Sequence, residues 1–170
     1  MIRNAKKNGL NVTCSTTIHN LFFDDQNLSG YNTNFKVLPP LRSAADIKSL
    51  KIAVKDGTID LVTCDHNPLN IELKDLEFEN AAFGTIGLES FFGALNKLFS
   101  TKLAIQILTR GRSKFSLSST SISVGELADI TLFNPNYDYV FSESQIFSKS
   151  KNSIFINYKL KGKVYGIISN

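Results

Sequence analysis

Tryptophan is absent from this sequence, and cysteine and histidine each occur only twice. Two cysteines are too few for a disulfide framework, and both Cys14 and Cys64 stand in apolar stretches, which favours reduced and buried thiols. No apolar run approaches the roughly 18 residues that a membrane span needs. The N-terminus is not followed by the apolar stretch of a signal peptide. We therefore expect a soluble, cytoplasmic protein with no membrane partner.

A concentrated stripe of positive charge is also missing. The formal net charge is +4, but the basic residues are scattered, with the densest groups at 6–7 and 159–163. Nucleic-acid binding favours a basic stripe interleaved with aromatic residues, so we expect no nucleic-acid partner. Hydrophobic residues make up 42% of the 170 residues, which is enough for a packed core in one domain or in pieces of two.

The first half of the chain alternates between helical and strand-like patterns. The first predicted unit is a helix at 2–8, closed by Gly9 and followed by a strand at 10–14. The second is a helix that begins at the capping box Ser43–Asp46, ends at Gly57 and is followed by a strand at 59–64. The first strand is short and β-branched, and the second is apolar without alternation, which is typical of a strand buried on both faces. Repetition of a helix–strand unit predicts an α/β fold with a parallel sheet.

The remaining pattern divides the chain near residue 115. Before it, we predict a short strand at 35–38 and two amphipathic helices, at 88–99 and 101–108. After it, serines cluster at 116–123, and the sequence predicts a strand at 128–133. The remainder, including 155–156 and 163–168, is predicted as strand and loop without helical periodicity. We therefore expect a helical α/β part at 1–115 and a C-terminal segment at 116–170 that forms a small β appendage.

Reactive residues of parallel α/β folds collect at the C-terminal ends of strands. His19 follows the first predicted strand, and Asp65 and His66 follow the second. An imidazole and a carboxylate from neighbouring strand ends are suitable ligands for a zinc-type ion. The structural alternatives are that Asp65 only caps a turn and that His19 is a hydrogen-bonded loop histidine.

Six segments, taken in order, resemble the dihydroorotase family of cyclic amidohydrolases. They are NVTC with IHNLFF (11–23), YNTNFKVLPPLR (31–42), DGTID with DHNP (56–68), FGTIGLE (83–89), ADITLF (128–133) and SKSKNS (148–153). The family fold is a (β/α)8 barrel of TIM type with a small β domain built from both chain ends. The resemblance implies that residues 1–115 hold barrel strands six to eight and the closing helices, and that 116–170 include the C-terminal share of the β domain.

The same resemblance implies a reaction and a set of site residues. Dihydroorotases reversibly hydrolyse the cyclic amide of dihydroorotate to N-carbamoyl-aspartate in pyrimidine biosynthesis, using one or two zinc ions. His19 matches a zinc ligand of the family, and Asp65 matches both a metal contact and the general acid/base. Phe83 and Gly84 match a loop whose backbone contacts the substrate, so we expect dihydroorotate or a related cyclic amide as the small-molecule substrate.

The sequence departs from the family at two substrate positions. Leu38 replaces an asparagine, and Leu69 replaces the second histidine of the family's Asp-His-Ala-Pro-His run. Each lost hydrogen bond to a charged ligand typically costs about 1.5–3 kcal/mol. The His-x-His-x-Arg motif, which supplies further ligands in the family, is also absent. We therefore expect a fragment or a truncated gene product that is inactive alone.

Three hypotheses remain at the level of sequence. The first is the C-terminal part of a zinc-dependent dihydroorotase or of a related cyclic amidohydrolase, and the retained His19 and Asp65 favour it. The second is a non-catalytic homologue that serves as a scaffold for a partner enzyme of pyrimidine synthesis, and Leu38 and Leu69 favour that one. An unrelated binding module is the third. Because three barrel strands leave apolar sheet edges open, we also expect a homo-oligomer or an enzyme partner.

Overall fold

The computed structural model describes residues 1–117 and 121–169, and it confirms an α/β chain. Within the described residues the α-helices are α1 (Ile2–Lys7), α2 (Ile18–Phe22), α3 (Ala44–Lys55), α4 (Leu88–Leu98) and α5 (Thr101–Thr109). The strands are β1 (Ser15–Thr17), β2 (Leu61–Thr63), β3 (Asp129–Val140) and β4 (Lys159–Ser169). Short 3-10 helices are η1 (Asp25–Leu28), η2 (Thr33–Phe35), η3 (Ile71–Leu73), η4 (Arg110–Phe115) and η5 (Glu143–Gln145). No helix in the described ranges is long and apolar enough to cross a membrane.

Strands β1 and β2 are parallel neighbours, with Ser15 opposite Leu61 and Thr17 opposite Thr63. The prediction of a strand at 10–14 was wrong, because the N–H of Cys14 donates to the Asp60 carboxylate and the ladder begins only at Ser15. The second strand is shorter than predicted. Outside these strands, an isolated parallel bridge joins His66 to Thr85. The described residues therefore contain a two-stranded parallel sheet and not a closed barrel.

The predicted helices are confirmed by their local chemistry. Helix α3 begins with the expected capping box, in which Ser43 and Asp46 exchange side-chain hydrogen bonds with each other's backbone N–H groups. The hydroxyl of Ser100 accepts the N–H of Leu103 and so caps α5. Gly9 has a φ of 77° after α1, which is the left-handed geometry expected of a C-terminal cap.

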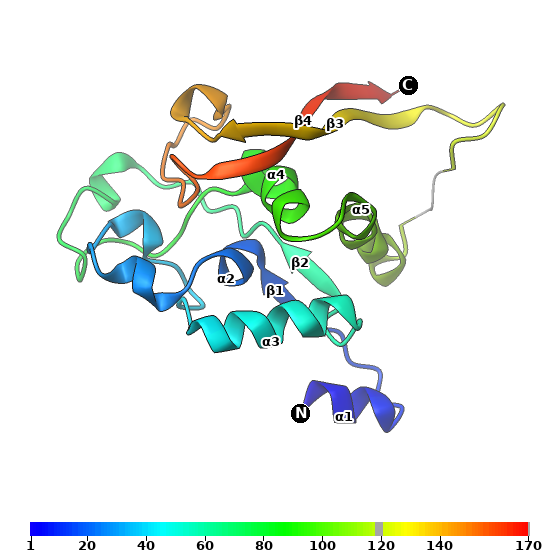
Figure 1. The fold of residues 1–170 in the computed structure, drawn as a ribbon, viewed down its shortest axis with the longest axis horizontal. Coiled ribbons are helices and arrows are strands. Elements are labelled where there is room, and N and C mark those ends of the chain that lie inside the picture. Colours follow the sequence, from blue (N-terminus) through cyan, green and yellow to red (C-terminus); the bar gives the residue numbers. More distant parts are fainter. Residues whose placement is uncertain (118–120, 170) are drawn as a thin grey trace.

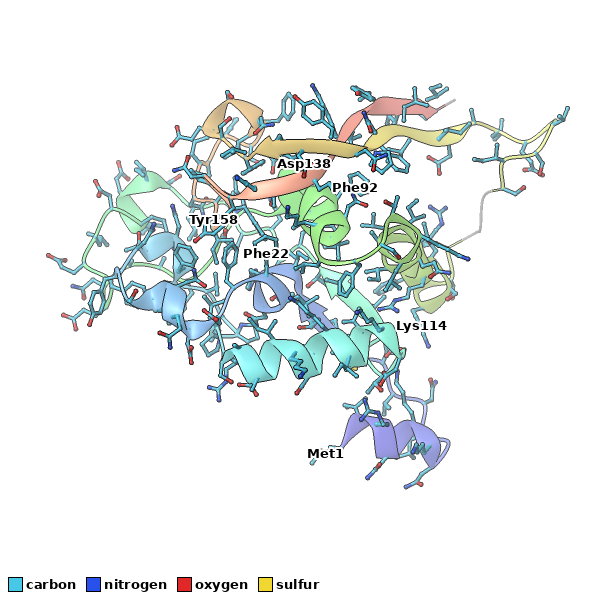
Figure 2. The ribbon with its side chains drawn as sticks, viewed as in Figure 1. Met1, Phe22, Phe92, Lys114, Asp138 and Tyr158 are labelled. Atoms are coloured by element: carbon cyan, nitrogen blue, oxygen red, sulfur yellow. The ribbon has the colours of Figure 1, made fainter. Side chains whose placement is uncertain are left out.

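The predicted strand at 35–38 is absent from the structure, and residues 155–156 of the predicted strand-and-loop remainder form a turn. Phe35 ends the 3-10 helix η2, and Phe155 lies in a turn. Both rings instead pack into an aromatic cluster, in which Phe23 lies 5.3 Å from Phe35 and 5.0 Å from Phe155 between ring centroids. The apolar residues that suggested strands are therefore core contacts. In Figure 2 the labelled Phe22 and Tyr158 belong to the same cluster, with ring centroids 6.3 Å apart.

The C-terminal segment contributes the antiparallel pair β3–β4, which crosses over α4, while α3 lies on the opposite side of β1–β2 (Figure 1). The predicted end of the first of these strands at Asn134-Pro135 was wrong. Strand β3 continues to Val140 because a register irregularity between Asn134 and Asp138 accommodates the proline. Phe92 of α4 packs edge-on against Phe133 of β3 at 5.0 Å. Positions 118–120 of the predicted serine cluster lie outside the described residues.

Candidate functional site

His19 lies in the first turn of α2, directly after β1. Thr17 ends the strand, and its hydroxyl accepts the N–H of Asn20, so the chain turns into the helix at this point. The imidazole is fully buried, and within the described part of the chain neither its Nδ1 nor its Nε2 atom has a hydrogen-bond partner. Burial lowers the pKa of His19 to about 4. The side chain is therefore neutral at pH 7, which is the form that can coordinate a metal ion.

Asp65 follows β2 at the same end of the parallel pair. Its backbone is left-handed, with a φ of 48°, a geometry that non-glycine residues adopt rarely and that is enriched at functional sites. The carboxylate remains partly exposed, and its Oδ2 atom lies 4.0 Å from Nε2 of His19. The expectation that these two side chains meet at one end of adjacent parallel strands is therefore confirmed.

His66, the residue after Asp65, caps a helix. Its Nδ1 atom accepts from the N–H groups of Gly87 and Leu88, at 3.3 and 3.4 Å, and so caps the N-terminus of α4. A side chain at Gly87 would collide with the carbonyl oxygen of Cys64, so glycine permits the close approach of this helix to the end of β2. These contacts hold the start of α4 against the segment that carries Asp65.

The predicted substrate-contacting backbone at Phe83 and Gly84 lies beside the Asp65 segment. The backbone N–H of Asn67 donates to the carbonyl of Thr85, and the side-chain amide of Asn67 donates to the carbonyl of Phe83 at 3.2 Å. The N–H of Gly84 is already used, because it donates to the carbonyl of Lys36 at 3.0 Å. The N–H of Phe83 has no partner among the described residues, so it is the backbone donor at this turn that is free for a ligand.

The two leucines at family substrate positions differ in their surroundings. Leu38 is 64% exposed, which is unusual for a large apolar side chain. Its neighbour Pro39 accepts from the side chain of Asn20 at 3.5 Å, which ties this segment to the helix that carries His19. Leu69 is partly buried, and its N–H donates to the Oδ1 atom of Asn152 at 3.2 Å.

Sequence reasoning missed two asparagines near this site. Asn67, between Asp65 and Leu69, places its side chain over Gly84, where a Cβ atom would collide with it. Asn152 comes from the C-terminal segment, and its amide donates to the carbonyl of Asn67 at 3.0 Å. The available signal for Asn152 was its place in the run 148–153, which resembled the family but suggested no role.

The metal-ligand set is partial. Within residues 1–117 and 121–169, no group of three or more His, Cys, Asp or Glu side chains converges. His19 and Asp65 fit two positions of a zinc site in donor type and proximity, and the unpartnered imidazole nitrogens are consistent with a missing ligand. A cavity of about 630 Å³ lies elsewhere, between α4 and β3–β4, and His19, Asp65 and Phe83 are not part of its lining.

Known proteins resemble this chain in sequence and in structure. No family model matches it. The dihydroorotase of Citrifermentans bemidjiense is 35% identical over 184 residues, covering 99% of this chain and 41% of that protein. The dihydroorotase of Endomicrobium trichonymphae is 41% identical over 170 residues, covering 95% of this chain and 40% of that protein. The chain thus spans about two fifths of the length of the curated relatives that it matches.

Among solved structures, a D-hydantoinase (dihydropyrimidinase) from Thermus sp. has a TM-score of 0.84 at 22% identity, covering 99% of this chain and 40% of that one. This likeness establishes a shared fold with a cyclic amidohydrolase. The sequence relatives extend over nearly the whole chain and carry one name. The chain therefore belongs to the dihydroorotase family of cyclic amidohydrolases and corresponds to the C-terminal part of its members.

Proposed function

We propose that this chain supplies the C-terminal share of a (β/α)8 dihydroorotase-type active site. The site would reversibly hydrolyse dihydroorotate, or a related cyclic amide, to its open-chain carbamoyl acid in cytoplasmic pyrimidine synthesis. One observation carries the proposal, namely that the buried and unpartnered imidazole of His19 lies 4.0 Å from the Asp65 carboxylate at the end of β1–β2. An apolar residue would fill the position of His19 without leaving two polar atoms unsatisfied.

His19 and Asp65 would hold zinc together with ligands that lie outside this chain. The low pKa of the imidazole keeps it neutral and able to coordinate across the physiological pH range. When bound, one or two zinc ions would lower the pKa of a water molecule and polarise the amide carbonyl. Histidine and carboxylate are donors that zinc accepts in catalytic sites.

Two groups of this chain would act on the substrate directly. The Asp65 carboxylate is partly exposed, so it can receive a proton from the attacking water and return it to the departing amide nitrogen. The free N–H of Phe83 would donate a hydrogen bond to a carbonyl or carboxylate oxygen of the substrate and orient it. Since His66 and Gly87 fix α4 against the Asp65 segment, this geometry is preorganised.

Leu38 and Leu69 would alter substrate preference. An asparagine and a histidine at these positions could hydrogen-bond a charged substrate, whereas leucines cannot. The loss amounts to about 1.5–3 kcal/mol for each contact, or roughly one to two powers of ten in affinity. We therefore propose that dihydroorotate itself is a poor substrate and that a less polar cyclic amide is preferred.

A chimera tests this proposal. The chain replaces the matching C-terminal part of the Endomicrobium trichonymphae dihydroorotase, to which it is 41% identical. We expect the purified chimera to bind zinc. His19→Gln should reduce the bound zinc, whereas the control Asp56→Asn, at an exposed carboxylate outside the site, should retain it. We also expect L38N and L69H each to contribute about a 10- to 100-fold rise in kcat/KM for dihydroorotate in the double variant L38N/L69H. Equal zinc content in the His19→Gln chimera would overturn the ligand role.

The second candidate is a non-catalytic homologue that serves as a scaffold for a partner enzyme of the same pathway, or for a second copy of itself. The exposed side chain of Leu38 favours it, because an apolar group at a substrate position is more readily explained by a protein contact. The chimera separates the two candidates. Zinc binding without turnover of any cyclic amide, even after L38N/L69H, would favour the scaffold.

A further inference from the structure

Two buried lysines hold the turn that carries Phe83. Lys74 is 3% exposed, and its ammonium group donates to the carbonyls of Ala82 and Gly84 at 3.0 and 3.1 Å. Lys36 donates to the carbonyl of Glu79 at 2.7 Å, and its ammonium lies 4.8 Å from the centre of the Phe83 ring. Among the described residues neither lysine has an acidic partner, so backbone carbonyls are the groups that satisfy them.

An ammonium group in this place is costly. Burial, together with the nearby charge of Lys36, lowers the pKa of Lys74 to about 8, so the group is still largely protonated at pH 7. A buried charge without a counter-ion opposes folding, and an apolar side chain of similar length would not carry that cost. We therefore attribute the charge at this position to the two backbone carbonyls that Lys74 binds.

Lys74 also determines the direction of the Phe83 N–H group. The carbonyl of Ala82 and the N–H of Phe83 belong to one planar, trans peptide unit, so they point in opposite directions. Because Lys74 holds that carbonyl inward, the Phe83 N–H must point away from Lys74. The neighbouring N–H groups of Ala82 and Gly84 are both bonded within the protein, to Leu73 and Lys36.

Asn152 connects this turn to the segment after Asp65. It is buried, and its side-chain amide donates to the carbonyls of Asn67 and Gly84, at 3.0 and 3.5 Å, while its Oδ1 atom accepts from Leu69. One side chain of the C-terminal segment therefore sets the spacing between the two loops that would border the substrate.

We propose that Lys74 and Asn152 are positioning residues, which orient the Phe83 N–H toward the substrate and hold it at a fixed distance from Asp65. The inference rests on the proposed function in assigning a ligand to that N–H. The orientation of the peptide unit itself does not depend on the ligand, so the two parts can be tested separately.

The first experiment measures amide hydrogen exchange in the 170-residue chain. In the wild type, the Phe83 amide should exchange rapidly, while the Ala82 and Gly84 amides are protected. K74M should reduce protection at Ala82 and Gly84 by at least about tenfold and leave the amides of α3 unchanged. The matched control is K51M, a lysine of α3, which should leave the turn protected. Unchanged protection in K74M, or a slowly exchanging Phe83 amide in the wild type, would overturn the proposal.

The second experiment uses the chimera and its preferred cyclic amide. K74M and Asn152→Ala should each raise KM about tenfold with less change in kcat and an unchanged zinc content, and K74R should restore part of the loss because it keeps the charged donor. A purely structural role would instead lower the melting temperature and the active fraction without changing KM. That outcome would overturn the positioning role. If K74M fails to fold, Asn152→Ala provides the same measurements.

The two failures can be told apart. A parent chimera that turns over no cyclic amide would overturn the proposed function, while the exchange experiment would still decide whether Lys74 orients the turn. A parent chimera that is active and insensitive to K74M would leave the proposed function standing and overturn the positioning inference.

Discussion

The Nε2 atom of His19 and the Oδ2 atom of Asp65 lie 4.0 Å apart, although the two residues belong to different helix–strand units. Parallel pairing of β1 with β2 places both strand ends at one edge of the sheet. The imidazole is buried and unpaired within the described residues, whereas the carboxylate is partly exposed. This asymmetry suits a neutral, fixed ligand beside a carboxylate that can exchange a proton with solvent or substrate.

Stability should depend on pH through His19. Its pKa is about 4 in the folded protein against 6.5 ordinarily, so the unfolded chain binds more protons between these values. The free energy of unfolding should therefore fall as the pH decreases from about 6.5 to 4, by up to roughly 3 kcal/mol, and His19→Leu should remove this dependence. Urea unfolding in the presence of a chelator measures it. Parallel pH profiles for the two proteins would contradict the prediction.

The isolated chain should be catalytically inactive. Its described residues provide two candidate zinc ligands, and a hydrolytic zinc site normally has three protein ligands and a bound water. We expect no hydrolysis of dihydroorotate above that of a His19→Ala control at any zinc concentration. Turnover that exceeds this control would show that a competent site assembles from this chain alone, for example between copies.

The chain should self-associate through the β3–β4 pair. Tyr165 and Ile167 of β4 are 62% and 72% exposed, and Phe147, in the connection between β3 and β4, is 94% exposed. Large exposed apolar patches favour association. Light scattering at micromolar concentration should report oligomers. The double variant Y165K/I167K should reduce them, because charges oppose pairing at sheet edges. Leu10→Lys, at an exposed apolar residue outside this pair, is the control and should not change the mass. A compact wild-type monomer would contradict the prediction.

Asp60 should matter more for stability than its surface neighbour Asp56. The nearly buried carboxylate of Asp60 accepts from the N–H of Cys14 at 2.9 Å and from the ammonium of Lys6 at 2.6 Å. These bonds join the starts of β1 and β2. Burial acts to raise its pKa, but these hydrogen bonds lower it on balance. We expect Asp60→Asn to reduce the free energy of unfolding by about 1.5–3 kcal/mol. Asp56→Asn, at an exposed carboxylate, should have a smaller effect because solvent screens its interactions. Equal effects in thermal or urea unfolding would refute this ranking.

The sequence predicted those features that depend on neighbouring residues. The capping box of Ser43 and Asp46 closes within one helical turn, and the apolar spacing of α4 follows the helical period, so both were visible locally. The position of His19 and Asp65 after successive strand-like units also predicted their proximity, because parallel strands end at a common edge.

Only the tertiary structure decided which apolar runs become strands and which become core. Phe35 and Phe155 have strand-like neighbours, yet their rings are held in an aromatic cluster with Phe23, and no local signal distinguishes the two outcomes. The same is true of the site. The turn that carries Phe83 is held by the bond from Gly84 N–H to the carbonyl of Lys36, and Leu69 N–H donates to Asn152, so both features depend on hydrogen bonds between distant segments. Such bonds form only after the chain has folded, so the residue types established the chemistry, and long-range packing established its geometry.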